Sequence, residues 1–339
     1  MLESLLAKAL TLKVGPSSIS SLASFPRVLL QDSTCLALPK ALSEDFPGSA
    51  NHSGSAATMR IQAYFEMKHG VFANFKLASF RENDQGSTLE ALEVARKGDL
   101  LIRDLGYFAL EAFREYIDKG VHLLSRLQLS SKLFDPDTGE EIDLLARLQS
   151  CGSMDGEVLA GGRSKVKMRL VAVAIPEKVA NERRRKLKAK RNNPTKRHLA
   201  LLSWQIFLTT VDAETLCLED IEKIYTMRWH IETLFKSWKS SLGVGSFNPQ
   251  ISASLARALT YAALLRVTLL HAKIMPAFFG RAAACEVSIL KFASLARTIF
   301  FAEELQGIDD RTLRENVRKH SLYEKRTRRN IMEQWMSLS

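Results

Sequence analysis

Apolar segments in the first quarter of the chain predict a β-sheet. Residues 25–34 form a short apolar run, as a buried strand would. Residues 60–69 and 71–80 alternate or run apolar on either side of Gly70, which is typical of two antiparallel strands joined by a turn. We therefore expect three strands here.

A strand–helix–strand pattern follows these three strands. A helix opened by a Ser/Thr cap is predicted over residues 87–95, before an apolar strand over 99–104. A helix over residues 108–119 ends at Gly120 and leads to a strand over 121–127. The order of these elements predicts a mixed α/β sheet flanked by helices.

Strands, turns and then two helices are predicted in the middle of the chain. Residues 128–219 contain many glycines and turn residues, with strands predicted over 165–175 and 199–210. A helix is predicted over 220–242, and an apolar helix over 251–275 has a stripe of Ala and Leu typical of core or subunit packing. Because charged residues interrupt this last helix, we expect it to be buried in the protein rather than to span a membrane.

One face of the helix predicted over 220–242 carries four chemically different side chains. At about 100° per residue, Tyr225, Arg228, Glu232 and Lys239 fall within roughly 60° of one another. A solvated amphipathic face is the ordinary explanation. The alternative is a site in which the carboxylate holds a metal ion while the other three side chains bind phosphate oxygens.

Two aspartates stand where predicted strands end. Asp32 is followed by Ser-Thr, and Asp104 is followed by Leu-Gly-Tyr-Phe. Taken singly, such an aspartate is more often a turn or helix-capping residue. With Glu232 they form a series of three carboxylates in the order strand, strand, helix. Three carboxylates can hold two divalent ions that stabilise both the attacking and the departing oxygen of a phosphodiester.

The spacing Tyr225-(2)-Arg228-(3)-Glu232-(6)-Lys239 resembles the signature of bacterial insertion-sequence transposases of the DDE class. The sequence around each upstream aspartate matches that family as well. The resemblance implies an α/β fold of the RNase H-like type, with a mixed five-stranded sheet flanked by helices. It also implies a β-rich insertion subdomain that interrupts this sheet, and a helical C-terminus.

The resemblance covers roughly residues 25–275 and divides the chain into five segments. These are a short N-terminal segment (1–24), the first part of the RNase H-like core (25–127), the β-rich insertion (128–219), the part of the core with the catalytic helix (220–276) and a basic helical C-terminal region (277–339). Full-length relatives carry a longer N-terminal region that recognises transposon ends. We therefore expect a truncated or internally initiated form.

The resemblance also implies a metal site. Asp32, Asp104 and Glu232 are expected to be the catalytic residues and to hold two Mg²⁺ ions, for which Mn²⁺ can substitute. Hard carboxylate oxygens are the ligands that Mg²⁺ prefers. No histidine or cysteine cluster has the spacing of a zinc site.

Six residues are expected to contact DNA by the same resemblance. Tyr225, Arg228 and Lys239 would bind phosphate near the metal ions, and Arg126 another phosphate. Trp204 would stack on a base flipped out near the cut, although a tryptophan in an apolar strand is as often a core residue. Trp229, next to the signature arginine, would face the DNA end or pack on the sheet.

Composition agrees with a polyanionic partner. The chain has 48 Lys and Arg against 37 Asp and Glu, a formal net charge of +11. A basic soluble protein with no polyanionic partner could have the same excess of Lys and Arg. The densest cationic run is Arg183–Arg191, either a DNA contact or a solvated helix or loop, and the C-terminal tail is also basic. Four scattered cysteines and the lack of an export signal predict a cytoplasmic, nucleoid-associated protein.

The function predicted from the sequence is that of a DNA transposase. It would cleave a strand at a transposon end and join the freed 3′-hydroxyl to target DNA. Its partner would be double-stranded DNA, bound by a homodimer, with no membrane involved. One alternative is a nuclease of the same fold without strand transfer. The other is a truncated, non-catalytic inhibitor of transposition that binds DNA or forms dimers.

Overall fold

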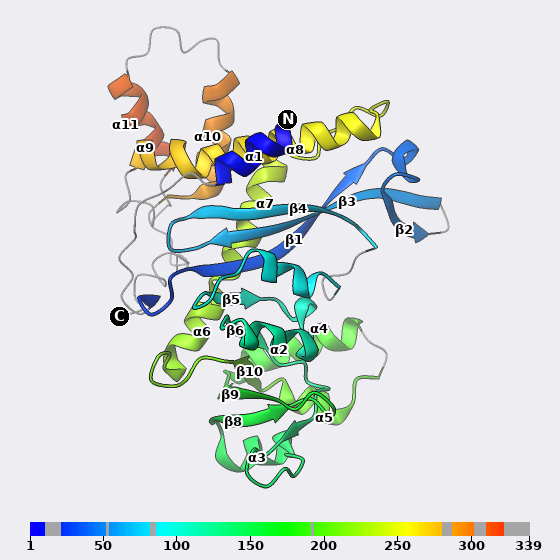
Figure 1. The fold of residues 1–339 in the computed structure, drawn as a ribbon, viewed down its shortest axis with the longest axis vertical. Coiled ribbons are helices and arrows are strands. Elements are labelled where there is room, and N and C mark those ends of the chain that lie inside the picture. Colours follow the sequence, from blue (N-terminus) through cyan, green and yellow to red (C-terminus); the bar gives the residue numbers. More distant parts are fainter. Residues whose placement is uncertain are drawn as a thin grey trace. The chain divides into compact units, whose positions relative to one another are not determined.

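The computed structural model describes residues 1–10, 22–51, 54–81, 86–190, 193–279, 287–301 and 310–321. The chain has a mixed α/β fold (Figure 1). It divides into two compact units: unit 1 is Met1–Ala23, Arg27–Asn83 and Thr226–Ser339, and unit 2 is Ser24–Pro26 and Asp84–Tyr225.

Unit 1 contains an antiparallel sheet. Its strands are β1 (Val28–Leu38), β2 (Pro47–Asn51), β3 (Gly54–Glu66) and β4 (Val71–Ser79), with β3 paired to each of the others. The predicted hairpin around Gly70 is confirmed, and this glycine has φ +68°, a conformation that other residues rarely adopt. The first strand is longer than predicted, so Asp32 lies in the middle of β1 and not at its end.

The helices of unit 1 are α1 (Leu2–Leu10), α7 (Trp229–Ser240), α8 (Ala253–Leu269), α9 (Met275–Phe279), α10 (Ile289–Phe301) and α11 (Asp310–Ser321). A π-helical turn over Leu270–Ile274 joins α8 to α9. Helix α1 lies against α8 (Figure 1), and Tyr261 of α8 donates a hydrogen bond to Glu3 of α1 over 3.3 Å. Helix α7 contacts β1, which brings the helix of the predicted signature onto the strand of the first aspartate.

The helix predicted over 220–242 is two helices. Helix α6 (Leu218–Thr226) ends before Met227, and α7 begins at Trp229. At the joint, His230 N–H donates to Met227 C=O and Ile231 N–H to Arg228 C=O, a three-residue spacing in place of the α-helical four. Because Tyr225 belongs to α6, the prediction that it shares one helix face with Glu232 and Lys239 is wrong.

One helix in the described part of the chain could cross a membrane by length and composition. It runs from Ala253 to Phe279 with a mean hydropathy of 1.4, and 39% of its apolar window is buried. Leu255 and Leu259 are 50% and 46% exposed. The helix is therefore partly buried, which corrects the expectation of a buried helix. A core helix can pass the same test, so this property alone assigns no membrane.

Two buried histidines lie in the aromatic core of unit 1. His230 on α7 and His271 in the π-helical turn both lie beside the Phe65 ring, with centroid distances of 5.3 and 6.0 Å. Burial lowers the pKa of His230 to about 4. Burial, with a contribution from neighbouring His230, lowers the pKa of His271 to about 3. Both imidazoles are therefore neutral at pH 7.

Acidification from pH 7.5 to 5.5 is expected to lower the free energy of unfolding by about 1.4 kcal/mol per buried histidine. Unfolded histidine takes up a proton below pH 6.5, whereas folded His230 and His271 stay neutral until about pH 4 and 3. The unfolded state thus gains protons first, and stability falls with pH in this window. Urea unfolding at several pH values measures the effect. A His271→Phe variant with the same pH dependence as wild type would contradict this explanation.

Unit 2 contains a mixed sheet with the order β5-β6-β10-β9-β8-β7. Its strands are β5 (Leu100–Arg103), β6 (His122–Arg126), β7 (Leu133–Phe134), β8 (Met154–Ala160), β9 (Val166–Ala174) and β10 (Trp204–Thr209). β5 and β6 are parallel, as predicted, and the other pairs are antiparallel. Because β10 pairs with β6, the strands of segment 128–219 continue this sheet.

Helices and turns complete unit 2. They are the 3₁₀ segments Gly86–Glu93 and Leu105–Tyr107 and the helices α2 (Leu110–Asp118), α3 (Leu144–Cys151), α4 (Glu177–Lys190) and α5 (Lys196–Leu201). The predicted α2 is confirmed. The helix predicted over 87–95 is a 3₁₀ segment, and the strand predicted over 199–210 begins as α5, so β10 starts at Trp204. Segment 128–219 is therefore as helical as it is β-rich.

Candidate active site

Asp32 lies at the surface of unit 1, on β1. Its neighbour Gln31 is fully buried, whereas its own side chain is 16% exposed, so the carboxylate is reachable from solvent. Its Oδ1 accepts a hydrogen bond of 2.8 Å from the Ser33 N–H. That bond restricts rotation of the carboxylate and leaves Oδ2 directed elsewhere.

Arg228 brings Asp32 and Glu232 together. The arginine is the N-cap residue of α7, and its Nη1 donates to Glu232 Oε1 over 2.8 Å, an i,i+4 pair. The same Nη1 lies 3.6 Å from Asp32 Oδ2. Two acids far apart in the sequence thus face one guanidinium, although Arg228 was predicted to bind phosphate.

Burial makes this contact stronger than an exposed ion pair. The Arg228 side chain is 7% exposed and that of Glu232 29%. A buried guanidinium requires negative charge nearby, and two carboxylates provide it. The Trp229 ring lies 5.1 Å from the guanidinium carbon and is itself 51% exposed, so it covers the arginine and faces solvent. Trp229 is thus not a buried residue of the sheet, and its position at a DNA end stays a prediction.

Asp104 belongs to unit 2. It follows β5 directly and is the N-cap residue of the 3₁₀ turn Leu105–Tyr107, so the prediction that this aspartate closes a strand is confirmed. The preceding Arg103 is 1% exposed and donates to Thr88 C=O over 3.1 Å. Its guanidinium also lies 4.7 Å from the Tyr116 ring, whose pKa burial raises to about 12. The backbone at Asp104 is therefore held by a buried cation.

The other signature residues differ in exposure. Lys239 is exposed on α7, seven residues after Glu232. Tyr225 is buried, and its ring packs on Phe207 of β10 with a centroid distance of 5.1 Å. The lysine is accessible to a phosphate, whereas the tyrosine supports the sheet of unit 2.

Trp204 and Arg126 lie in unit 2. Trp204 is the first residue of β10 and half-buried, and its indole Nε1–H donates to Gly152 C=O over 2.7 Å. It is therefore not an ordinary core residue, because part of the ring stays accessible while the hydrogen bond sets its orientation. Arg126 is the last residue of β6 and is also half-buried.

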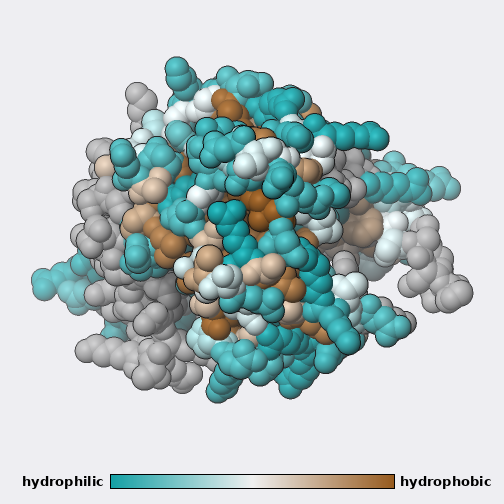
Figure 2. Space-filling model, turned by 90° about the horizontal axis from the view of Figure 1, so that it is seen from below, coloured by the Kyte–Doolittle hydropathy of each residue, from teal (hydrophilic) through white to brown (hydrophobic). Residues whose placement is uncertain are grey.

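The cationic run forms helix α4. Arg184 uses its donors within the fold. It donates hydrogen bonds to Leu199 C=O, Glu177 and Asn181, and it contacts Ser203. Arg185 and Lys188 are exposed. Arg191 and the basic residues after 321 lie outside the described residues. On the face shown in Figure 2, hydrophobic residues form separate patches among hydrophilic ones.

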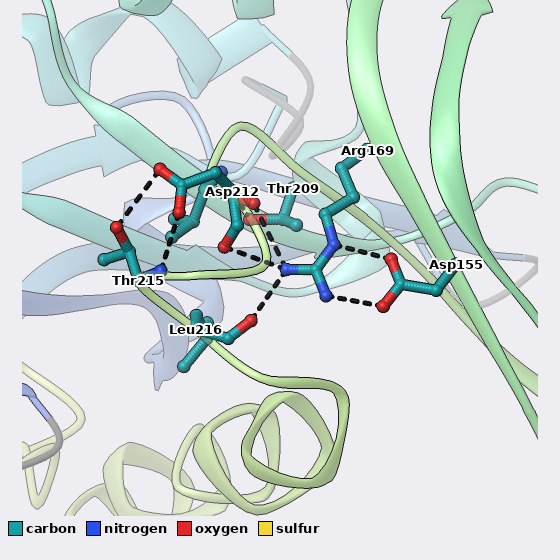
Figure 3. A network of polar contacts seen from close by, with 7 residues as sticks. Asp155, Arg169, Thr209, Asp212, Thr215 and Leu216 are labelled. Carbon is teal, nitrogen blue, oxygen red and sulfur yellow. Dashed lines mark hydrogen bonds and ion pairs between the residues drawn. The ribbon is translucent and has the colours of Figure 1, made fainter.

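Arg169 is a residue whose role the sequence did not reveal. Its guanidinium makes two bonds to Asp155, of 2.6 and 2.7 Å, across strands β9 and β8 (Figure 3). Its Nη1 also donates to the backbone carbonyls of Val211, Asp212 and Leu216, the last over 2.7 Å. These carbonyls belong to the loop that leads into α6. The alternation of residues in the strand predicts which side of the sheet Arg169 faces, but it does not predict this contact with a distant loop.

The carboxylates of Asp32 and Glu232 fit a hard divalent cation. Both lie within 3.6 Å of one nitrogen, and both are partly exposed. Among the described residues, no group of three His, Cys, Asp or Glu could hold a metal ion as it stands. The structure thus brings together two of the three predicted carboxylates, and the role of Asp104 stays a prediction.

Comparison with known proteins gives consistent matches. The model of the family "Transposase DDE domain" matches residues 23–267. The transposase for insertion sequence element IS231F from Bacillus thuringiensis subsp. israelensis is 27% identical over 65% of this chain and 50% of its own length. That for element IS231D from B. thuringiensis subsp. finitimus is 29% identical over 70% and 54%, respectively. The chain thus spans about half the length of the curated relatives it matches.

Among solved structures, the chain is similar to the piggyBac transposase in a synaptic complex with hairpin DNA, determined by cryo-electron microscopy. The TM-score is 0.43 with 10% identity, over 89% of this chain and 59% of the other.

Proposed function

The chain belongs to the family of the transposase DDE domain, and from this membership we propose that it catalyses cut-and-paste transposition of an insertion sequence. In this proposal it cleaves a DNA strand at the end of the element and joins the freed 3′-hydroxyl to target DNA. The observation that supports it is the meeting of Asp32 and Glu232 at Arg228. Carboxylate oxygens are the ligands that Mg²⁺ prefers, so this pair could form part of a metal site for phosphodiester chemistry.

Asp104 is proposed to complete this site in an RNase H-like arrangement. The three carboxylates would hold two Mg²⁺ ions, for which Mn²⁺ can substitute. When bound, the ions supply positive charge that stabilises the attacking and departing oxygens. The protein supplies fixed ligands, since Asp32 is oriented by the Ser33 N–H and Glu232 by Arg228.

The rest of the Tyr-Arg-Glu-Lys signature is proposed to position DNA. Lys239 is exposed and would bind a phosphate as a mobile point charge. Trp229 is exposed beside the acidic pair and would stack at the DNA end. Arg228 orients the carboxylates beside the DNA. The buried Tyr225 would act through its packing.

The proposed partner is double-stranded DNA, at transposon ends and at the target, bound by two copies of the chain. The formal net charge of +11 supports a polyanionic partner, because Lys and Arg that neutralise phosphates release counterions. The exposed cations of α4 and α7 provide such residues in both units.

The experiment that tests this function uses purified protein, Mg²⁺ and linear DNA that carries the ends of the element encoding it. We expect a nick at the element end, followed by products joined to a target plasmid. DNA with scrambled ends is the control. Nicks without joined products would indicate a nuclease. Binding without nicks would indicate the non-catalytic inhibitor.

Trp204→Ala is expected to lower the later, unpaired-base steps of end processing more than the first nick. Base–aromatic stacking contributes about 1–3 kcal/mol, and Trp204 is accessible for it. The measurement compares nicking with hairpin formation on the same end DNA. Trp204→Phe, which keeps an aromatic ring but loses the bond to Gly152 C=O, should retain more of the later steps.

The stability of Trp204→Ala separates the two roles of this side chain. Because the ring is half-buried, we expect a loss below the about 3–5 kcal/mol that removal of a core tryptophan costs. A full core-sized loss in a thermal melt, together with equal loss of nicking and hairpin formation, would show that Trp204 serves the fold.

A further inference from the structure

Two arginines of unit 2 lie near each other without an ion pair. Arg126 is the last residue of β6, and Arg183 lies in the second turn of α4. Burial lowers the pKa of the Arg183 guanidinium, and the neighbouring positive charge of Arg126 lowers it further. Within the described part of the chain, neither arginine forms a salt bridge, and the negative charge of Glu222 acts on the pKa of Arg183 in the opposite direction.

The sheet places these two side chains on one face. Arg126 is directly opposite Phe207 in the antiparallel pair β6–β10, so their side chains share a side of the sheet. Gln205 is two residues before Phe207 and lies on that same side, because side chains alternate along a strand. The Gln205 Oε1 accepts a 3.0 Å hydrogen bond from Arg183 Nη2. Gln205 thus holds the guanidinium of α4 over the face that carries Arg126.

Part of Arg183 lacks a partner. Its Nη1 is buried and has no hydrogen-bond partner among the residues that the structure describes. The adjacent Arg184 shows the contrast, since it bonds Leu199 C=O, Glu177 and Asn181. The charge of Arg184 is therefore compensated by groups of the protein itself. Arg183 combines a buried free donor with a second cation nearby, an arrangement that costs free energy unless an anion joins it.

We propose that Arg126 and Arg183 together bind one phosphate group of the DNA backbone, with Gln205 as the residue that positions Arg183. A guanidinium binds phosphate oxygens through paired N–H donors, which suits two arginines around one anion. The exposed Arg185 and Lys188 on α4 extend the positive surface, which suits a polymer rather than a free ion. The inference rests on the proposed function and adds Arg183 and Gln205 to the DNA contacts.

The test measures binding of linear end DNA by competition gel shift at fixed salt. Arg126→Gln and Arg183→Gln should each lower affinity by about tenfold, the effect of losing a charged hydrogen bond. The double variant should lose little more than either single one, because both arginines bind the same phosphate. Arg183→Lys and Gln205→Ala should give intermediate losses. The matched control is Arg147→Gln, an exposed arginine of α3 in the same unit, for which we expect about a twofold loss or less.

Salt dependence and stability give further readouts. The slope of log affinity against log salt should fall by about 1 in Arg183→Gln. Its melting temperature without DNA should stay equal or rise, because the substitution removes repulsion. A lower melting temperature with unchanged DNA affinity would show a structural role and overturn the site.

Inorganic phosphate, added to the protein at constant ionic strength, distinguishes the source of the anion. Loss of DNA affinity in the variants with no phosphate-dependent change in melting temperature supports a DNA contact. A phosphate-dependent rise in wild type, absent in Arg183→Gln and without an effect on DNA, would overturn it in favour of a free-phosphate site. Wild-type protein that cleaves end DNA while Arg183→Gln behaves like Arg147→Gln would overturn this site but not the proposed function. Wild-type protein that neither binds nor cleaves end DNA would overturn both.

Discussion

Glu232→Gln is expected to lower Mg²⁺-dependent strand cleavage by about a thousandfold or more, since catalytic residues that act as a unit cost this much singly. Glutamine keeps an oxygen that can accept the 2.8 Å bond from Arg228, so the local fold should survive. It removes the negative charge that would hold a metal ion. Asp32→Asn should have the same effect for the same reason.

The measurement pairs a nicking assay with a gel shift on the same end DNA. DNA retention should change little, because other basic residues supply most of the electrostatic attraction. Glu44→Gln, an exposed glutamate of the same unit, is the matched control and should cleave normally. If Glu232→Gln or Asp32→Asn nicks DNA at nearly the wild-type rate, that residue is not a metal ligand.

Arg169→Gln is expected to lower the free energy of unfolding by about 3 kcal/mol, at the lower end of the range for breaking a buried pair. The lower end applies because Asp155 is 30% exposed, whereas Arg169 is 8% exposed. The variant also leaves the carbonyls of Val211, Asp212 and Leu216 without their shared donor (Figure 3). Chemical denaturation of wild type and variant measures the loss.

The same strands provide the control for Arg169. Lys167 and Glu157 form a salt bridge of 2.9 Å between β9 and β8 with both side chains more than 60% exposed. Lys167→Gln should therefore change stability by well under about 1 kcal/mol. Asp155→Asn should cost less than Arg169→Gln, because the arginine keeps its backbone acceptors. If Lys167→Gln and Arg169→Gln lower the free energy of unfolding equally, the buried network stabilises the protein no more than an exposed salt bridge does.

Loss of Arg169 should also destabilise the loop that precedes α6. The loop it binds runs from the end of β10 to the start of α6, and α6 leads to Arg228. We expect hydrogen exchange to accelerate first at residues 210–217 in the variant. A uniform increase across unit 2 would indicate global destabilisation without a specific effect on this loop.

Local patterns in the sequence were sufficient for much of the fold. The hairpin around Gly70, the strand that ends before Asp104 and the parallel pair β5–β6 depend on periodicity, turn residues and a helical crossover between neighbours in the chain. The roles of Asp32, Asp104 and Glu232 stay predictions from the sequence, of which the structure brings Asp32 and Glu232 together. The spacing of the signature from Tyr225 to Lys239 and the sequence around each aspartate carried the family resemblance.

Tertiary packing decided the features that no local pattern encodes. The signature helix is broken after Thr226, at the buried residues Met227 and Arg228, although neither residue is a turn former in the sequence. The second carboxylate beside Arg228, that of Asp32, comes from β1, a strand distant in sequence.

The contacts of Arg169 and Arg183 likewise depend on which strands pair. In the sequence both residues look like other cations, whereas in the structure Arg169 is buried and Arg183 is half-buried with a buried Nη1. Charge and spacing are properties of the chain, whereas burial and the identity of a distant partner arise only when the strands and helices have packed.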